Sequence, residues 1–171
     1  MSKKGQAAME FLMTYGWAIV VVLAAIGALA YFGVLSPQKL LPDRTIFAAP
    51  VPSLDVAVIS KSGNNVSIAF RNNKGISITI PQIGGTATAT PATGITFCAA
   101  PTLTGTLGGV AMTPATQISN GGTFILTWNC TAPSGANIGD KFSSGFAFNY
   151  VNVDTTQTLT QTGSVDGKYG T

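Results

Sequence analysis

The longest apolar run in the chain extends from Phe11 to Leu35 and carries no charged residue. An α-helix rises about 1.5 Å per residue, so this run makes a helix about 37 Å long. The hydrocarbon core of a bilayer is about 30 Å thick. The run is apolar on every side, which is typical of a helix surrounded by lipid or by other helices. The pattern therefore predicts a membrane-spanning helix.

The hydrophobic period changes to two beyond residue 53, as it does in strands with one buried face. Three runs alternate apolar side chains with polar or small ones: Leu54-Val56-Val58, Val66-Ile68-Phe70 and Ile76-Ile78-Ile80. The segments between them, Ser62–Asn65 and Asn72–Gly75, hold the Gly and Asn residues that favour turns. These features predict a β-meander that begins at Leu54.

Further strands are expected in the second half of the chain. They lie near Ile95–Cys98, Thr123–Asn129, Gly145–Val153 and Thr158–Val165. The segment Gly84–Thr116 is rich in Thr, Ala, Gly and Pro, and we expect long surface loops there. About seven short strands on a chain of this length are typical of a two-sheet, immunoglobulin-like sandwich. The predicted fold class is α+β, with a long N-terminal hydrophobic helix followed by an all-β head.

A proline-rich segment separates the two parts. Its prolines are Pro37, Pro42, Pro50 and Pro52. Proline fixes φ and removes an amide donor, so a regular helix does not continue through this segment. We predict a helix over residues 6–36, a semi-rigid neck over 37–53 and a head over 54–171.

Lys3 and Lys4 precede the apolar run and favour an N-terminus that stays in the cytoplasm while the rest is exported. An ordinary secretory signal has a shorter apolar region followed by a small-residue cleavage site. Here the apolar run is longer, and Ser36-Pro37-Gln38 follows it. A retained signal anchor is one interpretation of this arrangement.

A second interpretation rests on residues 3–12, KKGQAAMEFL. This stretch resembles the class III leader of archaeal type IV pilins and archaellins. In that family a prepilin peptidase cuts before the apolar segment and the helix is kept. The resemblance implies that residues 1–5 are a cleaved leader, with Gly5 its last residue and Gln6 the first mature residue. Residues 66–80 are also similar to the head strands of archaeal pilins.

Glu10 is the only glutamate in the chain and directly precedes the N-terminal end of the apolar run. An ionisable group there costs a few kcal/mol on insertion and is a functional candidate. The resemblance places Glu10 at the fifth mature residue, where the family keeps a glutamate. It implies pairing with the α-amine of Gln6 in a neighbouring subunit, which would fix the axial register. The alternative is a carboxylate that lies in the lipid headgroup layer.

Small residues recur along the helix, among them Gly16, Ala24, Gly27 and Ala28. Ala24 and Ala28 have the small-xxx-small spacing that lets helix backbones approach closely. The alternative is that Gly and Ala are simply common in membrane helices.

The head carries the only two cysteines, Cys98 and Cys130. Export permits a disulfide between them, and two buried thiols are the alternative. Two N-x-S/T sequons mark Asn65 and Asn129 as glycosylation candidates. With no histidine in the chain, a zinc site and a His-based catalytic triad are not expected.

The chain is only 9% charged, and its net charge of +3 is partly that of the two leader lysines. Nothing in this composition indicates a nucleic-acid surface. The acidic residues form no close pair, and the Gly-Gly dipeptides lack a following Lys-Ser/Thr in phosphate-loop spacing. We therefore expect neither an enzyme nor a cofactor.

Together with the apolar helix and the β head, the resemblance to archaeal pilins implies a structural subunit of an archaeal type IV pilus-like filament that serves in adhesion. Its expected partners are copies of itself, a prepilin peptidase, the membrane assembly machinery and, before assembly, the membrane. Its expected location is the membrane as a precursor and then the extracellular filament. The alternatives are an archaellin-like motility subunit, a minor or priming pilin, and an uncleaved, membrane-anchored binding domain.

Overall fold

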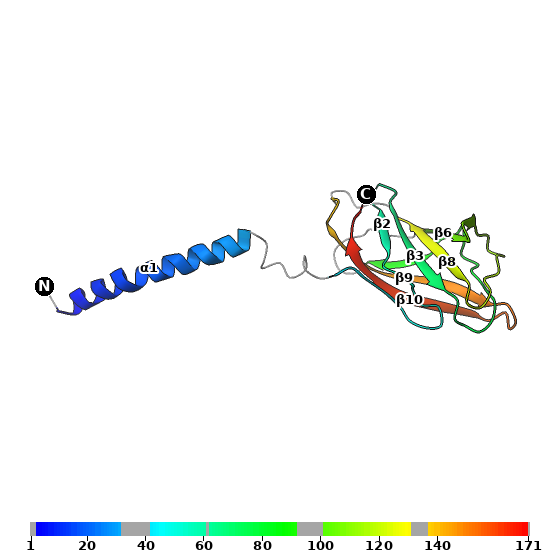
Figure 1. The fold of residues 1–171 in the computed structure, drawn as a ribbon, viewed down its shortest axis with the longest axis horizontal. Coiled ribbons are helices and arrows are strands. Elements are labelled where there is room, and N and C mark those ends of the chain that lie inside the picture. Colours follow the sequence, from blue (N-terminus) through cyan, green and yellow to red (C-terminus); the bar gives the residue numbers. More distant parts are fainter. Residues whose placement is uncertain (1–2, 32–41, 61, 92–100, 131–136, 171) are drawn as a thin grey trace. The chain divides into compact units, whose positions relative to one another are not determined.

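The computed structural model in Figure 1 describes residues 3–31, 42–60, 62–91, 101–130 and 137–170. The chain forms two compact units, Met1–Leu41 and Pro42–Thr171. In the described residues the first unit holds helix α1, and the second holds ten strands in two antiparallel sheets. The predicted α+β class is confirmed at this level: one apolar helix and a strand-rich head.

Helix α1 spans Lys3–Tyr31. It begins three residues before the predicted start at Gln6, and residues 32–36 of the predicted helix lie outside the described residues. The segment Met9–Tyr31 has a mean hydropathy of 2.1, and none of its most apolar window is buried in the chain. By length and composition, this helix can cross a membrane.

Sheet A is built around a long hairpin. Its strands are β1 (Arg44–Phe47), β4 (Ile78–Thr79), β5 (Thr88–Pro91), β9 (Lys141–Asn152) and β10 (Thr158–Lys168). The order is β1-β10-β9, and β4 and β5 pair with different parts of β9.

Sheet B contains the remaining strands in the order β2-β3-β8-β6-β7. They are β2 (Val58–Ser60), β3 (Asn65–Arg71), β6 (Thr102–Leu107), β7 (Val110–Ala111) and β8 (Thr123–Asn129). The two edges of this sheet are therefore β2 and β7.

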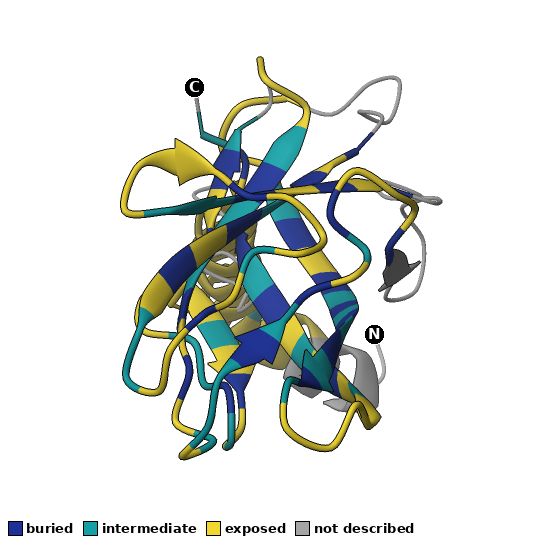
Figure 2. Ribbon diagram, turned by 90° about the vertical axis from the view of Figure 1, so that its right-hand side faces the viewer, coloured by how far each residue is buried: buried dark blue, intermediate teal, exposed yellow. Residues whose placement is uncertain are grey.

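The core lies between the inner faces of the two sheets. Buried and outward-facing residues alternate along the strands, which Figure 2 shows as dark blue and yellow bands. Phe70 of β3 meets Phe148 of β9 with ring centroids 5.1 Å apart. Trp128 of β8 meets Phe146 of β9 at the same separation. Aromatic contacts thus join the sheets face to face.

Several predicted strands are confirmed. Val66, Ile68 and Phe70 face the core from β3, and β8 has the predicted bounds Thr123–Asn129. The predicted strands Gly145–Val153 and Thr158–Val165 correspond to β9 and β10. The predicted strand Ile95–Cys98 lies outside the described residues.

The prediction for the run Leu54-Val56-Val58 was wrong. The strand begins only at Val58, and all three side chains face outward, with exposed fractions of 50%, 45% and 66%. Ile59 is buried instead because it lies opposite Val66 of β3. Directly opposed residues of an antiparallel pair point to the same face, so β3 fixes the phase of β2.

The predicted meander was also wrong. The chain leaves sheet B after β3, and the next strand, β4, pairs with β9 of sheet A. The turn before it is fixed by Asn72, which is fully buried. The Asn72 amide donates to the backbone oxygens of Ile76 and Ile118 at 2.8 and 2.9 Å. These bonds hold the chain in a turn that directs it across the core to the other sheet.

Two segments expected to lack regular structure contribute strands. The expected loop region Gly84–Thr116 contains β5, β6 and β7, and Leu103 of β6 is fully buried. Within the predicted neck, β1 pairs with β10, and Phe47 and Val51 lie in the core of the head. Tertiary pairing overrides weak local propensity in both places.

Candidate assembly surface on the helix

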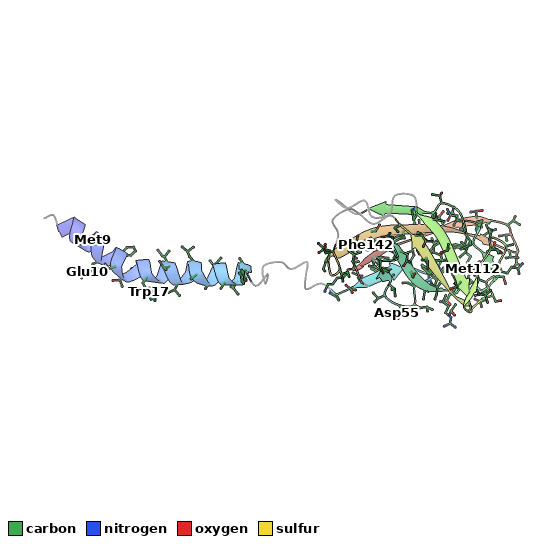
Figure 3. The ribbon with its side chains drawn as sticks, turned by 90° about the horizontal axis from the view of Figure 1, so that it is seen from above. Met9, Glu10, Trp17, Asp55, Met112 and Phe142 are labelled. Atoms are coloured by element: carbon green, nitrogen blue, oxygen red, sulfur yellow. The ribbon has the colours of Figure 1, made fainter. Side chains whose placement is uncertain are left out.

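Helix α1 presents large apolar side chains to the outside around its circumference. The exposed ones are Met9, Phe11, Met13, Tyr15, Trp17, Ile19, Val20, Val21, Val22, Leu23, Ile26, Leu29 and Tyr31. Figure 3 shows side chains projecting from successive turns of the helix, with Met9, Glu10 and Trp17 labelled. A surface of this extent requires a cover of lipid or protein.

One side of α1 forms an open apolar groove of about 380 Å³. It is lined by Phe11, Tyr15, Ala18, Ile19, Val22 and Leu23. The rings of Phe11 and Tyr15 lie one turn apart, with centroids separated by 4.5 Å. Residues at this spacing share a helix face, so the groove is a direct product of the sequence. It offers a shaped surface against which a second helix can pack.

Among the described residues, nothing packs against Gly16 or Gly27. A Cβ atom at either position would meet nothing within 4 Å. Glycine in a helix interior is less favourable than alanine by about 1 kcal/mol. This cost has no compensation within the described chain, and close approach by another helix would supply one.

Ala24 and Ala28 are exposed, and helical steps of about 100° place them with Glu10 roughly opposite the groove. The same steps place Trp17, which is 72% exposed, on that side as well, so bulky side chains occur on both sides of the helix.

The Glu10 side chain is exposed, and it has no ion-pair partner among the side chains that the structure describes. Its backbone oxygen accepts a hydrogen bond of 2.8 Å from the Thr14 hydroxyl. The Thr14 hydroxyl is thus satisfied within the helix, whereas the exposed Glu10 carboxylate is available to a partner or to the lipid headgroup layer. Gly5 and Gln6 lie within α1, and the structure does not describe the Gln6 side chain.

The described head sites lie close together, where β3 begins and β8 ends. Cys130 is buried and disulfide-bonded; Cys98 lies outside the described residues. Asn65 and Asn129 are register partners on β3 and β8. Asn129 is exposed and Asn65 is half-buried.

The described residues contain no group of three or more His, Cys, Asp or Glu that could hold a metal ion. Among the described head residues, burial, with a smaller contribution from Asp140, raises the pKa of Tyr169 to about 12. This is the behaviour of a phenol in the core rather than of a catalytic acid.

Comparison with known protein families, curated proteins and solved structures found no match to this chain. The functional argument therefore rests on the chain itself. The aromatic groove was not singled out from the sequence, although the spacing of Phe11, Tyr15 and Ala18 contains it.

Proposed function

We propose that this protein is the structural subunit of an archaeal type IV pilus-like surface filament that serves in adhesion. The observation that carries the proposal is the surface of α1: it is apolar on every side and unburied within the chain. The subunit is inserted into the membrane, clipped after Gly5 by a prepilin peptidase and moved from lipid into a core of packed helices. Its head, an immunoglobulin-like sandwich, forms the outer layer.

Assembly exchanges lipid contacts for helix–helix contacts. Lipid tails are as apolar as the helix, so close packing and polar pairs must supply the gain. The groove at Phe11 and Tyr15, and the open space at Gly16 and at Gly27, supply the packing. Glu10 pairs with the α-amine of Gln6 in a neighbouring subunit and thereby sets the register.

The rival function is that of an uncleaved, membrane-anchored binding domain. The glycines at positions 16 and 27 leave space for close approach by another helix, which a filament core would use and a lone anchor would not, and this favours the filament. An archaellin-like motility subunit shares the leader and the helix, and it is the alternative within the same class.

The test is to shear the cell surface and determine the N-terminus of the released protein by mass spectrometry. The filament proposal predicts a mature chain that begins at Gln6 and sediments as a polymer. An intact or only Met-trimmed N-terminus, found solely in membranes, would contradict it and support the anchored domain.

A further inference from the structure

Asn129 is the last residue of β8 and lies on the outer face of sheet B. It is exposed, and it begins the sequon Asn129-Cys130-Thr131. The backbone beside it is held in place, because Cys130 is buried and disulfide-bonded and donates its N–H to the Asn64 oxygen at 2.6 Å. The sequon therefore presents an accessible amide at a defined place on the head.

The Asn129 side chain leans inward along the sheet. Its register partner on β6 is Thr102, whereas Thr104 lies one row farther in, opposite Thr127. The Asn129 amide donates to Thr104 Oγ1 at 3.3 Å and to the Thr102 backbone oxygen at 3.4 Å. A group attached to Asn129 Nδ2 therefore begins over the interior of the outer face.

These two hydrogen bonds hold the amide only loosely. Both are longer than the N–H···O distance of about 2.9–3.0 Å that is most common in proteins. An asparagine amide has two N–H donors, and linkage to a sugar removes one of them. The donor that remains can still serve Thr104 or Thr102, so the linkage costs the head little of its own hydrogen bonding.

The outer face beside Asn129 is uncharged and rich in hydroxyl groups. Strands β3, β8 and β6 lie side by side there (Figure 1). Their outward residues, from the row of Asn129 to the row of Ile125, are Asn65, Ser67, Ala69, Ile125, Thr127, Asn129, Thr102, Thr104 and Thr106. Hydroxyl and amide groups both donate and accept hydrogen bonds, as the hydroxyl groups of a sugar do.

Ile125 adds an apolar contact to this face. It is 44% exposed and lies four residues before Asn129 on the same strand. At ~3.3 Å per residue the separation is about 13 Å, so an oligosaccharide of several sugars that runs along β8 reaches Ile125. Covering the exposed part of this side chain is favourable because it removes apolar surface from water.

Asn65, the asparagine of the other sequon, offers less room for a sugar in the folded head. It is half-buried and lies between Ser60 of β2 and Asn129 of β8. Its Nδ2 atom lies against the turn at residues 62–64, so close that a Cβ on Gly63 would be 2.7 Å away. A sugar on Nδ2 in this conformation would meet the turn, and the folded head therefore favours Asn129.

We propose that Asn129 carries an N-linked oligosaccharide that lies across the outer face of sheet B, over Thr104 and Thr127 toward Ile125. The linkage forms a bond between Asn129 Nδ2 and the anomeric carbon of a lipid-phosphate-linked oligosaccharide. The amide loses one proton, and the donor's phosphate leaves with the electron pair of the broken bond. The inference rests on the export of the head that the proposed function includes.

Glycopeptide and intact-mass spectrometry of the full chain from the cells that produce it test the linkage. The unmodified chain and Thr131→Ser, the matched control that keeps the sequon, should carry the added mass on Asn129. Asn129→Gln and Thr131→Ala should carry none on Asn129 or Asn65. An unmodified Asn129 in the natural chain, or a glycan found only on Asn65, would overturn the proposal.

Maleimide labelling of the full chain in detergent tests where the glycan lies. Ile125→Cys should react several-fold more slowly with the glycan present than in the Asn129→Gln background. Val110→Cys is the control: Val110 is 71% exposed, but it pairs with Leu107, which lies opposite Phe124 of the core face. Its rate should be the same in both backgrounds. Equal rates for Ile125→Cys in the two backgrounds would overturn the arrangement across the face.

The outcomes separate this inference from the filament proposal. Filaments whose subunits begin at Gln6 and carry no glycan would overturn the inference and leave the filament function standing. A glycan on Asn129 of an uncleaved chain found solely in membranes would support the inference and contradict the filament.

Discussion

Asn65 of β3 lies directly opposite Asn129 of β8, and both side chains are on the outer face of sheet B. Opposed residues of an antiparallel pair have Cβ atoms about 4.5–5.5 Å apart, which leaves no room for two sugars side by side. We predict that a single molecule carries a glycan on only one of the two residues.

Intact-protein and glycopeptide mass spectrometry check this prediction. Ser67→Ala removes the first sequon and should leave Asn129 with equal or higher occupancy. Molecules with glycans on both residues would contradict the prediction.

Under the proposed filament function, Glu10→Ala should leave export intact and strongly reduce the yield of sheared filaments, because the carboxylate proposed to set the register is lost. Thr14→Ala is the matched control: its hydroxyl is bonded within the helix, to the Glu10 backbone oxygen, and its loss should leave the yield unchanged. Normal yield from Glu10→Ala would remove the role assigned to this carboxylate.

Gly163→Ala should destabilise the head by roughly 2–4 kcal/mol, because an added methyl overpacks a filled site. A Cβ at Gly163 would lie 2.5 Å from the ring of Phe47 and also against the Ile46 backbone oxygen. Gly85→Ala is the control, because its Cβ would approach nothing closer than the Gln82 oxygen at 3.4 Å. Thermal unfolding by circular dichroism measures both, and equal midpoints would refute the prediction.

Asn72→Ala should destabilise the head by about 2–4 kcal/mol, because several buried backbone groups lose their partner together. The lost bonds include those to Ile76 and Ile118 and the one that Lys74 N donates to Asn72 Oδ1 at 3.0 Å. Asn73→Ala, at the exposed neighbouring position, should be nearly neutral. Denaturant unfolding of the two variants distinguishes them.

Stability should fall as pH rises above about 10. The pKa of Tyr169 is about 12 in the folded head, against an ordinary value of 10.0, so the folded state keeps a proton that the unfolded state loses. The contribution is complete below pH 10 and is lost as pH rises to 12, at about 1.4 kcal/mol per pH unit. Tyr169→Phe should remove this part of the decline in thermal unfolding scans from pH 8 to 12.

The sequence predicted those parts of the fold in which local pattern and tertiary environment agree. Strand β8 was predicted with its bounds because Phe124, Leu126 and Trp128 alternate and all face the core. In β6 the inward positions include Gly105, between Leu103 and Leu107, so the alternation is too weak to recognise. Its burial comes from pairing with β8.

Period and direction are separate properties of a strand. The run Leu54-Val56-Val58 has a period of two. Which of its faces is buried is decided by pairing with β3, and the run itself does not encode that pairing. The same limit applies to Gly163, whose need for glycine arises only when β1 packs beside β10.

The candidate site was predictable in outline because it is local. The residue order directly predicts an apolar helix with Glu10 near its N-terminal end. The helical spacing of Phe11 and Tyr15 predicts the groove between them. The open space around Gly16 and Gly27 among the described residues could be seen only in three dimensions.

The pairing of β1 with β10 has a mechanical consequence. Any pull that reaches the head through its N-terminal attachment is applied first to β1, the first strand after the helix. Its register with β10 runs from Arg44 opposite Asp166 to Phe47 opposite Gly163, with Phe47 seated in the core. A load along the strand shears these hydrogen bonds together instead of opening them one by one, so the head resists tension at the point where tension enters.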